Sequence, residues 1–183
     1  MIQIIDFGSS KTSSIASVVD EYMECEIIHY AEYGGPTTET LGIIFSGAPV
    51  LITEIDMSEY ISSFSWIKET EIPILGICFG HQLIGLIYGA NPSKQREDRD
   101  LQTIEFIMDH PLITGLAHEV EMLEDHFENI SIPPGFDHLA TSDTCINEGM
   151  VHKTKALFGV QFHPEVSGNV GSTLISNFIR LCD

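Results

Sequence analysis

The sequence predicts an α/β protein in which helices flank a mostly parallel central sheet, and two observations support this fold class. Short apolar runs alternate with segments of helical periodicity through the first half of the chain. These runs are nearly all apolar rather than alternating, as are strands buried on both faces of a parallel sheet. With 183 residues, of which 43% are hydrophobic, the chain can bury most of its apolar surface in one core. We therefore expect a single domain over residues 1–183.

The first half of the chain is expected to alternate strand and helix. Apolar runs that end at turn residues predict strands at 1–6, 25–30, 41–49 and 72–77. Apolar residues at helical spacing predict helices at 13–22, 57–70 and 81–89.

The second half has a different pattern. Residues 91–100 are polar and are expected to form a loop. Stronger alternation of apolar and polar residues then predicts antiparallel strands added at the edge of the sheet, in the segments 101–108, 118–123, 136–142, 145–152 and 156–162. An amphipathic helix is expected over 171–181.

The charge of the chain argues against two classes of partner. Its 27 acidic and 8 basic residues give a formal net charge of −19. Such a surface repels phosphate backbones and anionic lipids, so we expect binding neither to nucleic acid nor to a membrane. A solvated coat, adaptation to salt and a face for a basic partner protein all remain open explanations of the charge.

The four cysteines are scattered, and no two are arranged as Cys-x-x-Cys. This usage is typical of a reducing compartment and favours neither a disulfide framework nor a zinc site. The first residues lack the basic and long apolar regions of a signal peptide, and no apolar stretch is long enough to span a membrane. We expect a cytoplasmic protein without a structural metal.

One cysteine stands where a buried strand should end. In ILGICFG, residues 74–80, Cys78 lies between Gly76 and Gly80 at the junction of a predicted strand and a predicted helix. This is the layout of a nucleophile elbow, whose tight turn needs small neighbours and exposes the side chain at the edge of the sheet. The partial positive charge of a helix N-terminus also favours the reactive thiolate form. An inert buried cysteine is the alternative for this stretch alone.

A candidate base follows another apolar run. In GVQFHPE, His163, Pro164 and Glu165 come directly after the predicted strand. His163 can take the thiol proton and give it to a leaving amine, while Glu165 can bond the other ring nitrogen and fix its tautomer. Pro164 cannot donate a ladder hydrogen bond and helps to end the strand.

An oxyanion hole would require backbone N–H groups near the same point. Phe79, directly after the cysteine, offers one of them. Gly47 or Ala48, in the loop FSGAP after the strand LGIIF, can offer the other. Parallel strands bind ligands beyond their carboxyl ends, so these three loops are expected to meet there.

Together these segments resemble the class I glutamine amidotransferases over nearly the whole chain. The family's Gly-x-Cys-x-Gly-x-Gln turn, His-Pro-Glu segment and Ser-Gly-Gly-Pro-like loop are matched by Gly76, Cys78, Gly80 and Gln82, by His163, Pro164 and Glu165, and by Ser46, Gly47 and Pro49. The resemblance implies a flavodoxin-like fold, a catalytic triad of Cys78, His163 and Glu165, and hydrolysis of L-glutamine through a cysteinyl thioester without a cofactor. It also implies substrate contacts from Gln82, Gly80 and His126.

Within the family, IIDFGSS, GIIFSGAP and IPPGFDHLATSDTC are most similar to the GMP synthetase branch. That likeness implies that the ammonia goes to ATP-activated xanthosine monophosphate on a separate synthetase (ATP-pyrophosphatase) subunit, because no P-loop glycine pattern is present in this chain.

Three alternatives remain open. The chain could serve another synthase or cleave γ-glutamyl bonds with the same chemistry. It could be a catalytically silent binding or regulatory module, since REDRD replaces the glycine-containing pocket segment that the family has before LQTIEF. A flavodoxin-like nucleotide binder is disfavoured because no Gly-x-Gly-x-x-Gly follows the first strand.

Overall fold

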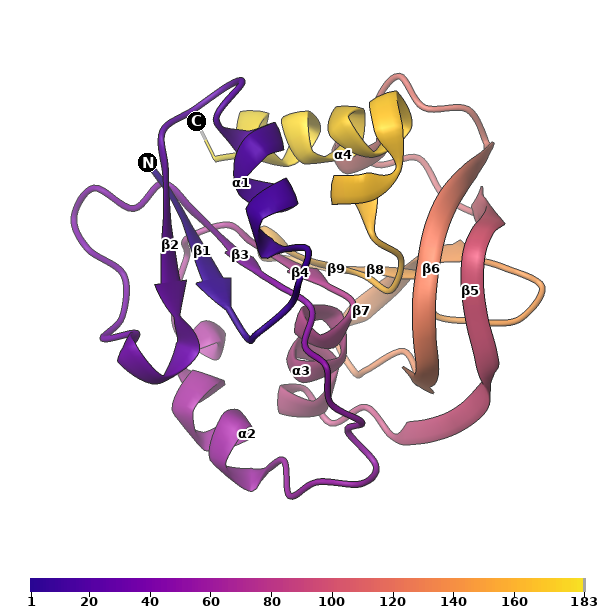
Figure 1. The fold of residues 1–183 in the computed structure, drawn as a ribbon, viewed down its shortest axis with the longest axis horizontal. Coiled ribbons are helices and arrows are strands. Elements are labelled where there is room, and N and C mark those ends of the chain that lie inside the picture. Colours follow the sequence, from indigo (N-terminus) through magenta and orange to yellow (C-terminus); the bar gives the residue numbers. More distant parts are fainter. Residues whose placement is uncertain (183) are drawn as a thin grey trace.

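A computed structural model describes residues 1–182, except for the side chain of Arg96, and over this range the chain forms one nine-stranded mixed sheet between two layers of helices (Figure 1). The strand order is β2-β1-β3-β4-β9-β8-β7-β5-β6. The strands are β1 (Ile2–Asp6), β2 (Cys25–His29), β3 (Gly42–Phe45), β4 (Ile74–Ile77), β5 (Pro92–Phe106), β6 (Glu119–Ile130), β7 (Phe136–Thr141), β8 (Gly149–His152) and β9 (Leu157–Val160). The helices are α1 (Thr12–Val19), α2 (Ser58–Phe64), α3 (Phe79–Ile87) and α4 (Gly168–Arg180), with short 3₁₀ turns at Tyr30–Glu32, Ser65–Lys68, Pro111–Ile113 and Pro164–Val166.

The five strands β2, β1, β3, β4 and β9 pair in parallel. β3, β4 and β9 are buried along their whole length, which explains their unbroken apolar sequences. The remaining strands continue the sheet with antiparallel pairing, from β8 beside β9 out to the long β5–β6 hairpin. The predicted fold class, a largely parallel sheet with antiparallel edge strands, is confirmed.

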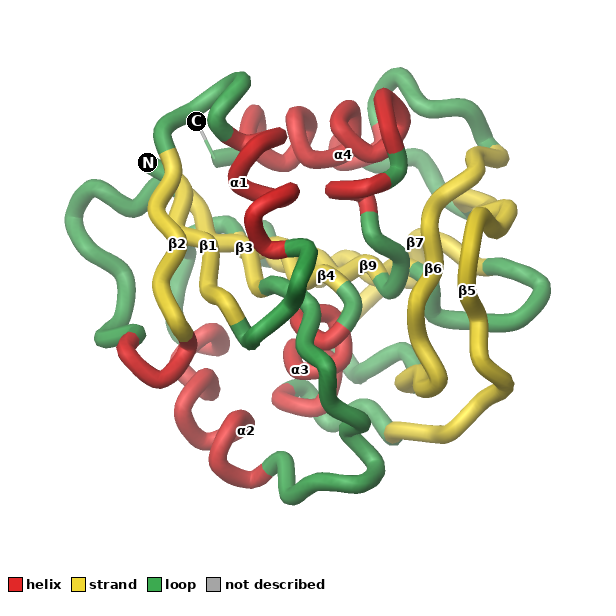
Figure 2. Tube along the Cα trace, in the orientation of Figure 1, coloured by secondary structure: helices red, strands yellow, loops and turns green. Residues whose placement is uncertain are grey.

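The helices cover both faces of the sheet, as Figure 2 shows with α1 and α4 above it and α2 and α3 below it. Each layer has its own apolar core. α4 contributes Leu174, Ile175 and Phe178 to the first core, and α3 contributes Leu83 and Ile84 to the second. Among the described residues, no helix has the length and apolar character that crossing a membrane requires.

Two expectations about the strands were wrong. Residues 91–100 are not a loop, because β5 begins at Pro92 and pairs with β6 through a bulge between Lys94 and Asp98. This hairpin extends beyond the helices, so most of residues 91–100 are exposed and polar, and the apolar pattern of a strand is missing. The segment 156–162 is not an antiparallel edge strand either, because β9 lies in the interior of the sheet and pairs in parallel with β4.

The other bounds differ by a few residues. α1 ends at Val19 rather than residue 22, and the segment 57–70 divides into α2 and a 3₁₀ turn that ends at Lys68. α3 begins two residues earlier than predicted, directly after Cys78, so this cysteine occupies the turn itself.

Candidate active site

Cys78 occupies a strained turn between β4 and α3. Its backbone has φ 52°, which L-residues rarely adopt, and its N–H donates to the Val160 carbonyl at 2.9 Å. A Cβ atom on Gly76 would lie 2.5 Å from the carbonyl carbon of Gly80, and one on Gly80 would lie 2.5 Å from the Phe45 carbonyl oxygen. The two glycines therefore let the helix begin this close to the strand.

His163 and Glu165 follow β9, the neighbour of β4. The His163 N–H donates to the Leu123 carbonyl at 2.9 Å, and Nδ1 of the ring lies 2.8 Å from Oε1 of Glu165. The imidazole and the thiol of Cys78 line the same small cavity. Burial alone would lower the pKa of His163, but its interactions with Cys78 and with Glu165 raise it to about 10. The structure thus brings the three predicted residues together, with an imidazole that carries a proton at neutral pH.

The loop after β3 lies against the thiol. Ser46 holds it, because the Ser46 hydroxyl accepts from the Phe7 N–H at 2.9 Å and donates to the Gly47 carbonyl at 2.8 Å. A Cβ atom on Gly47 would lie 3.4 Å from Cε1 of His163 and 3.7 Å from Cβ of Cys78. Gly47 therefore lies close to the side chains of both Cys78 and His163.

The other two predicted oxyanion residues are Ala48, in this same loop, and Phe79, at the start of α3. Ala48 lines the same small cavity as Cys78 and His163. Among the described non-glycine residues only Cys78 and Asp100 have positive φ, so Ala48 occupies its place in the loop without backbone strain. Phe79 is the first residue of α3, where backbone N–H groups have no acceptor within the helix.

A cavity of about 410 Å³ opens beside the thiol, a size that suits a small-molecule ligand. Cys78, Gln82 and His126 are among the residues that line it. The Gln82 amide donates to the Glu128 carbonyl and to Oε1 of Gln161, both at 3.1 Å. The lining does not include Gly80, whose N–H instead donates to the Ser46 carbonyl at 3.1 Å. This hydrogen bond of Gly80 connects the turn around Cys78 to the loop after β3.

His126 lies at the inner wall of this cavity and is 4% exposed. Its Nδ1 lies 3.0 Å from the carbonyl oxygen of Glu128, and the side-chain amide of Gln95 lies 3.1 Å from the same nitrogen. The carboxylate of Glu128 points elsewhere and accepts from the backbone N–H groups of Ile52 at 2.5 Å and Thr53 at 3.1 Å. Glu128 therefore fixes the loop that forms the opposite wall.

Two residues that matter for the site were missed from the sequence. Gln161 donates its amide to Sγ of Cys78 at 3.6 Å, which links the thiol to Gln82. Asp125, at the cavity mouth, accepts from Nζ of Lys11 at 2.7 Å and lies 3.5 Å from Nε of Arg99. Burial opposes ionisation of Asp125, but the hydrogen bond and charge of Lys11 outweigh it and hold the pKa below its ordinary value. A polar Gln161 inside an apolar run and an Asp125 next to His126 were the available signals.

Comparison with known proteins agrees with this geometry. A sequence model described as Glutamine amidotransferase class-I matches residues 3–181. One subunit of the glutamine-hydrolyzing GMP synthase of Methanosarcina acetivorans is 39% identical over 145 residues, which cover 78% of this chain and 74% of that protein. The subunit of the same description from Pyrococcus furiosus is 38% identical over 144 residues, covering 77% of this chain and 75% of the relative.

Solved structures give the same result for the fold. A Thermoplasma acidophilum protein assigned to the same type of GMP synthase subunit superposes with a TM-score of 0.90 at 29% identity, over 99% of this chain and 92% of that one. A glutamine amidotransferase of Thermotoga maritima shares the fold with a TM-score of 0.76 at 18% identity, over 98% of this chain and 82% of that one.

Proposed function

We propose that this chain, which belongs to the class I glutamine amidotransferases, is the glutamine-hydrolysing subunit of a GMP synthetase. One observation carries the chemistry: a cysteine on a strained turn and a buried histidine that is paired with a glutamate line one small cavity, beside a larger cavity of about 410 Å³. The acceptor of the ammonia is inferred from the relatives that are named as subunits of GMP synthase.

In the proposed reaction, the thiolate of Cys78 attacks the side-chain amide carbon of glutamine. The developing oxyanion is received by backbone N–H groups of Phe79 and of Gly47 or Ala48. His163 gives its proton to the departing nitrogen, and ammonia leaves a glutamyl thioester on the sulfur. His163 then takes a proton from water as the water attacks the thioester, which releases glutamate and restores the thiolate.

The charges at the cavity mouth complement the two charged groups of a free amino acid. Asp125 offers a carboxylate to the α-ammonium group, and Arg99, which is about 59% exposed at its side chain, offers a guanidinium to the α-carboxylate. Gln82 lines the cavity between this mouth and the sulfur, and the buried Gln161 links its amide to the thiol. The cavity therefore suits glutamine better than a peptide, whose backbone carries neither charge.

The ammonia acceptor is proposed to be a separate synthetase subunit that activates its nucleotide with ATP. The net charge of −19 supports docking to a basic face on such a partner. The scattered cysteines support a cytoplasmic location for the complex.

The test measures ammonia released from glutamine by the purified chain, alone and mixed with a GMP synthetase ATP-pyrophosphatase subunit. We expect release to be abolished in Cys78→Ala and to fall by roughly 100-fold or more in His163→Ala, because each removes a reacting group. Cys25→Ala and His118→Ala are matched controls, since both residues lie outside the site and should leave release unchanged. When xanthosine monophosphate and ATP are added to the mixture, the synthetase subunit should use the ammonia to convert xanthosine monophosphate into GMP.

Two results would test the catalytic assignment and the ammonia acceptor separately. Unchanged ammonia release by Cys78→Ala would end the catalytic assignment altogether. Release that depends on Cys78 but yields no GMP with the synthetase subunit would keep the glutaminase and reject this acceptor.

A further inference from the structure

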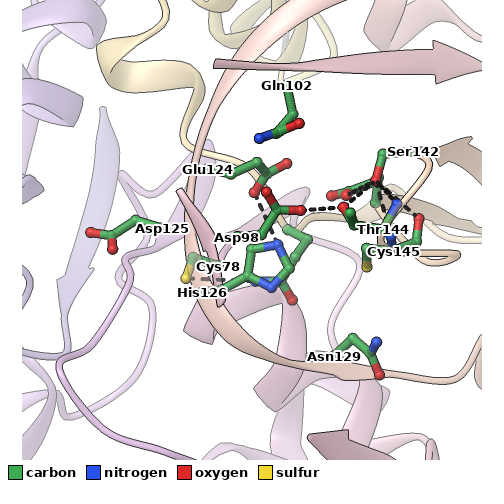
Figure 3. Close-up of polar contacts among 12 residues, drawn as sticks. Cys78, Asp98, Gln102, Glu124, Asp125, His126, Asn129, Ser142, Thr144 and Cys145 are labelled. Carbon is green, nitrogen blue, oxygen red and sulfur yellow. Dashed lines mark hydrogen bonds and ion pairs between the residues drawn. The ribbon is translucent and has the colours of Figure 1, made fainter. Parts of the chain in front are cut away.

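Behind the inner wall of the cavity lies a buried cluster of three carboxylates and one imidazole. Asp98 comes from β5, Glu124 and His126 from β6, and Glu148 from the residue before β8, and their exposed fractions are 3%, 1%, 4% and 0%. One ligand atom each from Asp98, His126 and Glu148 can be chosen so that all lie within 4.8 Å of one another. Nε2 of His126 also lies 3.1 Å from Oε2 of Glu124. Figure 3 shows the side chains of Asp98, Glu124 and His126 converging on one point.

The outer atoms of the cluster are satisfied by hydroxyl groups. Ser142 donates to Oε1 of Glu148 at 2.7 Å, and Thr144 donates to Oδ2 of Asp98. These two hydroxyls come from the turn between β7 and β8 and hold the carboxylates in place, as partners of metal ligands commonly do.

The inner atoms are poorly satisfied. Oε1 of Glu124 and Oε2 of Glu148 are buried without a hydrogen-bond partner, and Oε2 of Glu124 faces only Nε2 of His126, at 3.1 Å. Among the side chains that the structure describes, no lysine or arginine forms an ion pair with these three carboxylates. Burying such carboxylates without compensation is unfavourable, so their charge must be neutralised by a cation or by protons.

The contacts of His126 allow that group to be a metal ion. Nδ1 lies 3.0 Å from the Glu128 carbonyl oxygen, which can accept a proton from it, and 3.1 Å from the amide nitrogen of Gln95, which can donate one. With the proton on Nδ1, the neutral ring directs the lone pair of Nε2 at the carboxylates, and a metal ion would select this tautomer. A histidine that ligates a metal commonly has this arrangement, with its other ring N–H donated to a carbonyl or carboxylate.

We propose that Asp98, His126 and Glu148 bind one divalent transition-metal ion, with the Glu124 carboxylate beside them as further negative charge. Two carboxylate oxygens and one imidazole nitrogen form a donor set suited to Zn²⁺ or Mn²⁺. The ion would join β5, β6 and the turn before β8. Since His126 lines the glutamine cavity, it would also fix the position of that wall. The proposal revises the expectation of a chain without metal, which was based on the spacing of cysteines.

The competing explanation is that protons replace the ion. Burial raises the pKa of Glu124 to about 8 and that of Glu148 well above its ordinary value. A metal-free cluster would then be held together as carboxylic acids, and its stability would increase as the pH falls.

The decisive experiment is a calorimetric titration of the EDTA-treated full chain with ZnCl₂ and with MnCl₂, together with melting curves. We expect one ion per chain, a higher Tm with the metal, and affinity reduced at least about 100-fold in Glu148→Gln. His118→Ala is the matched control: His118 lies 3.8 Å from Glu105 across the same hairpin, but both side chains are exposed. This variant should bind as the original chain does.

Two further measurements keep the test independent of any one variant. Asp98→Asn removes a second ligand with little change of shape and should lose binding in the same way. Bound Co²⁺ should give ligand-field bands of oxygen and nitrogen coordination without a thiolate charge-transfer band. Failure of both metals to bind, with a Tm that increases as the pH falls, would overturn the proposal in favour of the protonated cluster. Binding that survives both Glu148→Gln and Asp98→Asn would overturn it as well.

Discussion

Nδ1 of His163 lies 2.8 Å from Oε1 of Glu165, and both residues are buried beside the thiol of Cys78. This pairing helps to raise the pKa of His163 from 6.5 to about 10, against the opposing effect of burial. The ring is therefore an imidazolium at neutral pH, ready to protonate a leaving nitrogen. Because the folded-state pKa is raised, the stability contributed by His163 is fully present below about pH 6.5 and is lost as the pH rises through about 10.

The first prediction concerns the pH dependence of glutamine hydrolysis. At neutral pH His163 keeps its proton, so we expect no fall of kcat/KM from its deprotonation there. The fall should come as the pH rises through about 10. Glu165→Gln removes a negative charge that raises the pKa of His163, so its alkaline limb should move to lower pH, with a loss of rate of roughly 100-fold or less. Ammonia release measured across the pH range checks both statements. An alkaline limb in the same place in Glu165→Gln would contradict the proposed coupling.

The second prediction concerns the reactivity of the cysteines toward iodoacetamide near neutral pH. Cys78 lines the cavity next to an imidazolium, so it should be alkylated first. The thiol of Cys25 is more exposed, yet burial, its hydrogen bond to Asp20 and the charge of Asp20 raise its pKa to about 12. Burial and the charges of Glu148 and Glu124 raise the pKa of Cys145 as well.

Peptide mass spectrometry of the chain after brief labelling gives the order of modification. A single adduct at Cys78, accompanied by loss of ammonia release, is the expected result. Prior incubation with glutamine should slow the labelling, because substrate occupies the cavity. Modification of Cys25 ahead of Cys78 would show that exposure, rather than thiolate character, controls the reaction.

The catalytic segments could be predicted from the sequence because each is local. A strained turn needs glycines at fixed offsets, so Gly76 and Gly80 identify the elbow around Cys78 without knowledge of the fold. The parallel order of the strands then places the loops after β3, β4 and β9 at one edge of the sheet. The structure agrees, since Cys78 and His163, 85 positions apart in the sequence, line the same small cavity.

The β5–β6 hairpin could not be predicted in the same way. Its polar residues reflect exposure beyond the helical layers, and only the pairing with β6 reveals a strand. The buried cluster is hidden for a related reason, because Asp98, Glu124 and Glu148 lie on separate elements and have no ligand spacing in the sequence. A carboxylate in an acidic chain is usually solvated, so burial was the missing information.

The third prediction tests the close approach of α3 to β3. Replacing a helical glycine with alanine ordinarily stabilises a helix by about 0.5–1 kcal/mol. At Gly80 the sign should reverse, because the new Cβ would lie 2.5 Å from the Phe45 carbonyl oxygen and 2.6 Å from the Phe45 Cβ, in the interior of the sheet. We expect Gly80→Ala to lower the free energy of unfolding by about 1–3 kcal/mol.

The same substitution should reduce ammonia release, because the Gly80 N–H holds the Ser46 carbonyl at 3.1 Å and with it the oxyanion loop. Gly34→Ala is the matched control, since a Cβ at Gly34 would have no neighbour within 4 Å. Urea unfolding of the two variants beside the original chain measures the difference. If Gly80→Ala unfolds at the same urea concentration as Gly34→Ala, the helix can move away from the strand, and the elbow does not depend on a glycine at this position.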